Sequence, residues 1–159
     1  MTLELFERAV CDGHTRRRRA GREMISVEGV YDDGWMGGDA VFALAGRALV
    51  SIEISGHLPE LGVLLPQELA VQVRGQQAQV VVLTASGPFS LSVPLSSNGA
   101  APGAWEVSLT PSRMFCPMVH GLSADSRDLS VQLLRVRALT HDSREIVKTL
   151  GSVTAGRPR

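Results

Sequence analysis

Apolar and polar side chains alternate along most of the chain that follows Met24. In residues 50–55, Val50, Ile52 and Ile54 fall on one side of an extended backbone, and serine and glutamate fall on the other. Successive side chains of a β-strand point to opposite faces, so this alternation predicts a strand with one buried face. The same period of two recurs, and predicts strands, in residues 69–74, 89–94 and 105–110.

Residues 78–84 show a different pattern, because apolar residues occupy both alternating sets of positions. Such a segment predicts a strand in the centre of a sheet. Gly75 precedes it, and since glycine adopts positive φ without a steric cost, we expect a tight hairpin there. Further on, residues 129–138 carry apolar side chains in two opposite phases, and the change at Leu133 and Leu134 predicts a β-bulge.

Several short strands separated by turn residues, with no strand–helix–strand spacing, predict an all-β fold. We interpret it as an antiparallel β-sandwich, with a closed barrel as the alternative. The chain is expected to divide into a short helix and Arg-rich linker (1–23), the β domain (24–140), and a helical turn with a disordered tail (141–159). The N-terminal helix is expected at residues 2–10 and the helical turn at residues 143–150.

The charge balance argues against nucleic acid as a partner. The chain has 16 basic and 16 acidic residues and a formal net charge of zero, whereas nucleic-acid binders show a basic excess. The arginine run at residues 16–19 is interpreted as a charged linker. Neither a signal-peptide core nor an apolar run long enough to span a bilayer occurs, so we expect a cytoplasmic protein without a transmembrane segment.

Three stretches resemble a known kind of module. They are Tyr31-Asp-Asp-Gly-Trp-Met-Gly37; residues 69–95, which end in Gly87-Pro-Phe-Ser-Leu-Ser-Val-Pro94; and Ser112-Arg-Met-Phe-Cys-Pro117 with the later Ser126-Arg-Asp-Leu-Ser-Val. Together they resemble a β-sandwich accessory module found beside bacterial glycosyltransferase and methyltransferase domains of surface-polysaccharide biosynthesis. The likeness covers about residues 24–139. It implies a jelly-roll-like sandwich with a non-catalytic, carbohydrate-related role. In the central hairpin, Arg74 and Gly75 replace the Asn-Gly turn of such modules.

Candidate ligand-binding residues cluster in the first of these stretches. Flat rings such as Tyr31 and Trp35 pack against the C–H face of a sugar, and Asp32 and Asp33 can accept hydrogen bonds from its hydroxyls. The alternative is structural: the aspartates bond to the local backbone of a turn, and Trp35 closes the end of the core. Trp105 is in phase with buried residues and is expected in the core.

Arg113 is the remaining candidate. Its guanidinium suits bidentate binding of a carboxylate or phosphate, and an ion pair with Asp125 or Asp128 is the alternative. Aspartates recur without calcium-loop spacing, histidines are scattered, and no nucleophile, dinucleotide or phosphate-loop motif occurs. We therefore expect no catalytic residues, no metal and no cofactor.

These observations support two functional hypotheses and leave a third open, an enzyme whose site forms only in three dimensions. The first is a non-catalytic, carbohydrate-related binding module that acts beside a glycan-modifying enzyme, with a glycan as ligand and a glycosyltransferase or other protein as partner. The second is a structural or protein-interaction β-sandwich with no sugar ligand. A homodimer is compatible with either.

Overall fold

The computed structural model describes residues 24–46, 48–95 and 103–151. The expected helix at residues 2–10, the linker and the C-terminal tail lie outside these ranges. The described residues form nine strands and one short 3-10 helix. Their bounds are β1 (Met24–Val30), β2 (Met36–Ala45), β3 (Leu49–Leu58), η1 (Gly62–Leu64), β4 (Gln67–Val73), β5 (Gln79–Leu83), β6 (Gly87–Pro94), β7 (Ala104–Pro111), β8 (Gln132–Thr140) and β9 (Glu145–Thr149).

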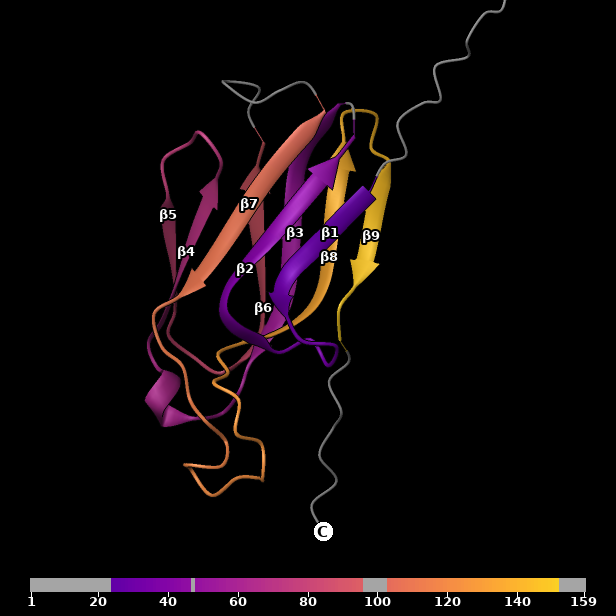
Figure 1. Ribbon diagram of the computed structural model, residues 1–159. Coiled ribbons are helices and arrows are strands. Elements are labelled where there is room, and N and C mark those ends of the chain that lie inside the picture. The colour runs from indigo at the N-terminus through magenta and orange to yellow at the C-terminus, as the bar shows by residue number, and fades with distance from the viewer. Residues whose placement is uncertain (1–23, 47, 96–102, 152–159) are drawn as a thin grey trace, which may run out of the picture.

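The strands form two antiparallel sheets (Figure 1). One sheet has the order β1-β2-β7-β4-β5 and the other the order β6-β3-β8-β9. Within the described chain, the pairs β1–β2, β4–β5 and β8–β9 are the consecutive strands that pair directly, and the other connections pass between the sheets. The prediction of an all-β, antiparallel fold is therefore confirmed.

One hydrophobic core receives side chains from both sheets. Phe42, Leu69 and Leu109 enter it from the five-stranded sheet, and Ile52 and Val136 enter it from the four-stranded sheet. The inward set of β4 comprises every second residue, as the alternation predicts. Burial of one apolar face per sheet, at about 25 cal/mol per Å² of apolar surface, is the main stabilising contribution to such a fold.

Two local predictions are also confirmed. Gly75 has φ +83° in a β-turn closed by the N–H of Gln76 on the carbonyl of Val73, so the hairpin of β4 and β5 is confirmed, although its loop is longer than a tight turn because the last register pair is Val71 with Gln79. In β8, the register against β3 shifts between Leu133 and Arg135, so that Leu134 is the extra residue of a bulge. The bulge reverses the phase of the buried side chains at the point where the sequence pattern changes.

The prediction that residues 78–84 form a central strand is wrong. The segment forms β5, which is the last strand of the five-stranded sheet. Val80 and Val82 lie on the outer face and are 59% and 49% exposed. In a parallel sheet, a central strand is apolar on both faces because both faces are covered. This antiparallel sheet has one open face. An apolar pattern on both faces of a strand therefore does not show whether the strand lies at the centre or at the edge of the sheet.

Two further expectations are corrected. Residues 145–149 form strand β9 rather than a helical turn, because this segment pairs with β8 along its whole length. Val50 does not share the buried face of Ile52 and Ile54 but is 39% exposed. The register of β3 against β8 shifts between Leu49 and Ser51, which turns Val50 outward. Among the described residues, no helix has the length and apolar character needed to cross a membrane.

The turn between β1 and β2 is held against β8. Gly34 donates its N–H to the carbonyl of Tyr31 at 2.8 Å and accepts a hydrogen bond from the N–H of Leu133 at 2.8 Å. Its φ is +84°, and a Cβ atom there would lie 2.5 Å from the carbonyl oxygen of Leu133. The position therefore requires glycine both for its conformation and for the close approach of two backbones.

We expect the loss of stability in three glycine-to-alanine variants to follow the two effects, positive φ and steric clash. Gly34→Ala suffers strain and a backbone clash and should lose at least about 2 kcal/mol of the free energy of unfolding. Gly75→Ala has positive φ but open space around it, and should lose about 1 kcal/mol. Gly38→Ala has neither problem and should stay within about 0.5 kcal/mol of the parent. Urea unfolding at neutral pH measures all three, and an unchanged Gly34→Ala protein would contradict the assignment.

Candidate functional site

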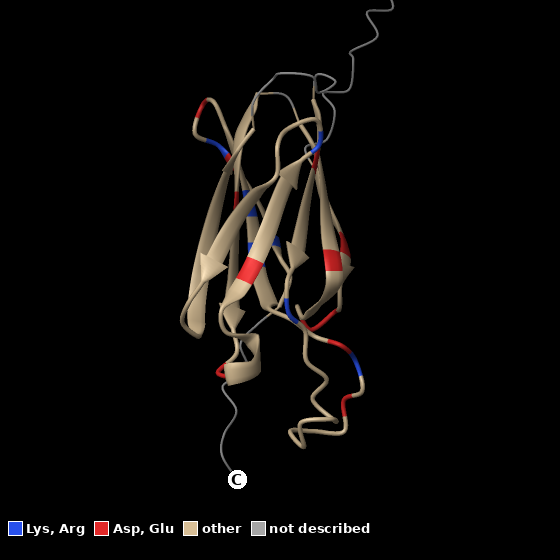
Figure 2. Cartoon of the chain, turned by 90° about the vertical axis from the view of Figure 1, so that its left-hand side faces the viewer, with Lys and Arg blue, Asp and Glu red and all other residues tan. Residues whose placement is uncertain are grey.

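Three segments meet at one end of the molecule, which is the lower end in Figure 1. They are the turn of residues 31–35, the residues before η1, and the long loop of residues 112–131 between β7 and β8. Figure 2 shows residues of both charges along this loop, which extends beyond the sheets. The lower end therefore combines apolar and charged side chains from distant parts of the sequence.

The start of the loop is fixed by the buried side chain of Gln67. Its Nε2 donates to the carbonyl of Arg113 at 2.9 Å, and its Oε1 accepts the N–H of Arg113 at 2.9 Å. The hydroxyl of Ser112 donates to the same Oε1 at 3.1 Å. Gln67 is fully buried, and its amide satisfies both backbone groups of one loop residue, which would otherwise be left without partners near the core.

The end of the loop is fixed in a similar way by Ser130. The Ser130 hydroxyl, also fully buried, donates to the carbonyl of Met36 at 3.1 Å. Between these two anchors, Phe115 and Leu129 exchange backbone hydrogen bonds of 2.8 Å in both directions. The loop is thus closed at its base, and Phe115 is placed beside Trp35.

A groove of about 350 Å³ opens between the loop and the sheets, and we call it the Trp35 groove. The Trp35 and Phe115 rings meet edge to face, with centroids 5.9 Å apart and planes inclined by 71°. Trp35 is half-buried, so that part of its ring faces the groove. The groove is lined by Trp35, Pro59, Glu60, Leu61, Phe115, Pro117, Leu122, Ser123, Asp125 and Leu129.

Arg127 joins the turn to the loop in a charged cluster beside the groove. Its Nη2 lies 2.7 Å from Oδ2 of Asp33 and 2.7 Å from Oδ2 of Asp125. Its Nε also donates to Oδ1 of Asp125 at 3.0 Å. The guanidinium carbon lies 4.5 Å from the centroid of the Tyr31 ring, within the range of a cation–π contact.

The cluster changes the protonation equilibria of its members. Hydrogen bonds from Arg127 hold the pKa of Asp33 and the pKa of Asp125 below the usual range of aspartate. The same hydrogen bonds, first from Asp125 and then from Asp33, raise the pKa of Arg127. Both carboxylates are therefore ionised at neutral pH, and with a single guanidinium the cluster carries a formal charge of −1.

The structure brings together three of the five predicted site residues. Tyr31 and Asp33 contact Arg127, and Trp35 lines the groove. Asp32 is exposed in the same turn. Asp33 also performs the structural role considered for it, since its Oδ1 accepts the N–H of Trp35 at 3.4 Å.

The alternative considered for Arg113, an ion pair with Asp125 or Asp128, is not present among the described residues. Asp125 is paired with Arg127 instead, and Arg113 is exposed with its backbone held by Gln67. Arg127, two positions after Asp125, forms the ion pair because both residues belong to one turn. In this turn the N–H of Arg127 donates to Oδ1 of Asp125 at 3.0 Å. In the described chain, no three His, Cys, Asp or Glu side chains are grouped closely enough to hold a metal ion.

Sequence reasoning missed Glu60, Phe115 and Arg127 as site residues. Arg127 had a local signal, since Ser123, Asp125 and Arg127 are spaced by two residues and Asp125 accepts from Arg127 within a short turn. Glu60 had none, because it reaches the groove only through the connection from β3 to η1.

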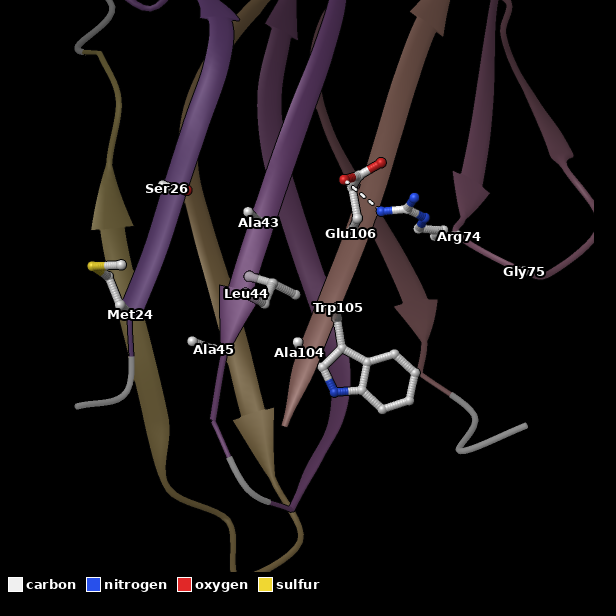
Figure 3. A pocket seen from close by; sticks show the side chains of 10 residues that line it. All are labelled: Met24, Ser26, Ala43, Leu44, Ala45, Arg74, Gly75, Ala104, Trp105 and Glu106. Atoms are coloured by element: carbon white, nitrogen blue, oxygen red, sulfur yellow. Dashed lines mark ion pairs between the residues drawn. The ribbon is translucent and has the colours of Figure 1, made fainter. Parts of the chain in front are cut away.

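A second depression of about 790 Å³ lies over β1, β2, β7 and the turn after β4 (Figure 3). Trp105 lines it but also packs against the core, in phase with Val107 and Leu109 as predicted. Its two charged side chains, Arg74 and Glu106, form an ion pair of 3.6 Å with each other. The remaining lining is uncharged and includes three alanines, and Trp105 is the one aromatic residue among the lining residues, whereas Trp35 and Phe115 both line the Trp35 groove.

The cluster predicts an acid-dependent stability that Arg127→Met removes. A carboxylate whose pKa is lowered on folding stabilises the protein above its ordinary pKa of about 3.9, and this stabilisation is lost as the pH falls through the lowered value. Arg127→Met should therefore be less stable than the parent at pH 7, and the difference should shrink towards pH 3. Urea unfolding at both pH values measures this. The control Arg74→Met, which removes an exposed ion pair, should follow the pH dependence of the parent. A stability difference for Arg127→Met that is independent of pH would contradict the prediction.

We compared the chain with family models, curated protein sequences and solved structures. No family model, no curated protein sequence and no solved structure matches the chain.

Proposed function

We propose that this chain is a non-catalytic carbohydrate-binding module that binds a glycan in the Trp35 groove. The observation that carries the proposal is the partial exposure of Trp35 in a groove that also contains carboxylates. A fully buried Trp35 would have favoured a purely structural role, whereas a half-buried Trp35 that lines the groove beside Phe115 leaves aromatic surface for a ligand.

The lining matches the chemistry of a sugar. Trp35, Phe115 and Leu122 offer apolar surface to the C–H groups of a pyranose, and Glu60 and Ser123 offer oxygen atoms to its hydroxyls. Both oxygens of Asp125 already accept hydrogen bonds from Arg127. Hydrogen bonds to charged acceptors are shorter and stronger than those between neutral groups. Binding sites of this kind are predominantly apolar, with a few placed polar groups that fix the orientation of the ligand.

The charges of the site favour a neutral glycan or one that carries amino groups. Both charged residues of the groove, Glu60 and Asp125, are acidic. Arg127, which pairs with the groove residue Asp125, is already bound to both Asp33 and Asp125. A uronic acid or a phosphorylated sugar would place a like charge near these carboxylates, which is unfavourable.

The setting of the module belongs to the same proposal. We propose that the two sheets form a jelly-roll-like β-sandwich and that the module acts in the cytoplasm beside a glycosyltransferase or another glycan-modifying enzyme. This part rests on the resemblance of the Tyr31–Gly37, 69–95 and 112–131 stretches, and the shared core of the two sheets is compatible with it.

A second function, protein binding without a sugar, is favoured by the tip of the long loop. Met118, Val119 and Leu122 are 54%, 75% and 54% exposed and lie close together in sequence. Contiguous exposed apolar residues are typical of protein-interaction surfaces. The two surfaces share Leu122, but Met118 and Val119 do not line the Trp35 groove, so substitutions at these two positions separate the functions.

A glycan-array screen of the full chain, followed by calorimetric titration of the retained sugar, tests the glycan proposal. Glu60→Gln keeps the size of the side chain but removes its charge, and we expect it to weaken binding roughly tenfold or more, as for loss of a charged hydrogen bond. Its matched control is Glu68→Gln, an exposed carboxylate on the outer face of β4, which should bind like the parent.

The result that would overturn the glycan proposal is an array on which no neutral or amino sugar is retained, or equal affinities of Glu60→Gln and the parent. A Val119→Ser variant separates the second function, since it should reduce capture of a protein partner and leave sugar affinity unchanged.

A further inference from the structure

The four edge strands of the two sheets differ in how their free edges are protected. An edge strand exposes unpaired N–H and C=O groups, which proteins commonly shield with charges, prolines, bulges or covering elements. Edges without such protection can pair with another chain. The edges here are β1 and β5 in one sheet and β6 and β9 in the other.

Three of these edges are protected. The register of β1 is broken by a bulge at Gly29, and Nζ of Lys148 in β9 donates to the carbonyl of Ile25 in β1 at 3.4 Å. β9 itself carries Glu145 and Lys148. β6 carries Pro88 and Pro94 near its two ends, and proline cannot donate to a neighbouring strand.

The fourth edge, β5, has none of these devices. Its sequence is Gln-Val-Val-Val-Leu, and it pairs with β4 in an unbroken register. No Asp, Glu, Lys, Arg or His occurs anywhere between Arg74 and Glu106. Among the described residues, no backbone hydrogen bond joins β5 to any element other than β4. Figure 1 shows β5 at the outer margin of its sheet.

We propose that β5 is a self-association edge, through which two copies of this chain pair antiparallel to join their five-stranded sheets into one continuous sheet. A second copy fits because the strand is complementary to itself. With the two-fold axis at Val81, all five residues of β5 find a partner, and each Val80 lies opposite the Val82 of the other copy. Cross-strand pairs of β-branched residues are favourable, and no like charges meet.

The inference is independent of the glycan proposal. β5 belongs to the β4–β5 hairpin, and none of its residues lines the Trp35 groove. Pairing through β5 would give a dimer with two grooves, and either proposal can fail without the other.

Paired charge variants of the full chain test the register itself. In Val80→Lys/Val82→Lys, lysine faces lysine across the two-fold axis, and we expect the dimer dissociation constant to rise at least about tenfold. In Val80→Lys/Val82→Glu, each lysine faces a glutamate of the other copy, and the dimer should persist and weaken at high salt. Analytical ultracentrifugation under reducing conditions, which excludes disulfides through Cys11 or Cys116, measures both. Both valines are exposed, by 59% and 49%, and circular dichroism checks that each variant keeps its β structure.

Hydrogen exchange of the parent protein provides a test without mutation. Dilution should accelerate exchange of the β5 amides, while the amides of β9, the matched edge strand, should be unaffected. The proposal is overturned by a parent protein that stays monomeric at about 100 µM, by a dimer that survives Val80→Lys/Val82→Lys, or by equal dissociation constants of the two charge variants. A monomeric parent that instead binds a foreign strand at β5 would likewise exclude the second copy as the partner.

Discussion

The arrangement of the lower end depends on the burial of two hydrogen-bonding side chains, Gln67 and Ser130. The loop satisfies part of its backbone through its own turns and the Phe115–Leu129 bridge, but its two ends need partners outside it, and an unpaired buried polar group costs about 1–3 kcal/mol. Gln67 satisfies the N–H and the carbonyl of Arg113 where the loop leaves β7, and Ser130 bonds to the β2 backbone where the loop returns to β8. With both ends of the loop fixed, Phe115 is held against Trp35. The loop then bounds the groove on one side and the sheets bound it on the other.

Arg127 adds an electrostatic constraint on the same loop. Unlike Gln67 and Ser130, its side chain is not fully buried. It binds Asp33 in the β1–β2 turn and Asp125 in the loop, two carboxylates that would otherwise repel each other. The side chain thereby couples two segments that are far apart in sequence. Its positive charge is compensated within the cluster, because both aspartates are bound to it.

The sequence was sufficient for most of the strand pattern and for the positions where backbone geometry is restrictive. Alternation predicts which residues of β4 and β7 are buried, and Gly34, Gly75 and the change of phase at Leu134 are each explained by local stereochemistry. The edge position of β5 could not be predicted. The alternation of apolar and polar residues shows which face of a strand is covered, but it does not show which strands are its neighbours in the sheet. Of the candidate site, the Tyr31–Trp35 turn was found by its local pattern. Glu60 and Phe115 were not, because long-range packing places them there.

The connectivity of the sheets has a consequence for how the chain reaches this structure. The central pairs, β2 with β7 and β3 with β8, join strands that are separated by most of the domain, and the strands between them pass from sheet to sheet. Closure of such long loops must precede the contacts that stabilise them, so folds of this kind form in roughly milliseconds to seconds, slower than helical bundles. During that time the β4–β5 hairpin, whose contacts are local, can form early and display its uncharged edge before the rest of the sheet exists. For a newly made chain, the period before the sheets close is the one in which such an edge is open to pairing with other chains, and the length of that period depends on topology as well as on the stability of the finished fold.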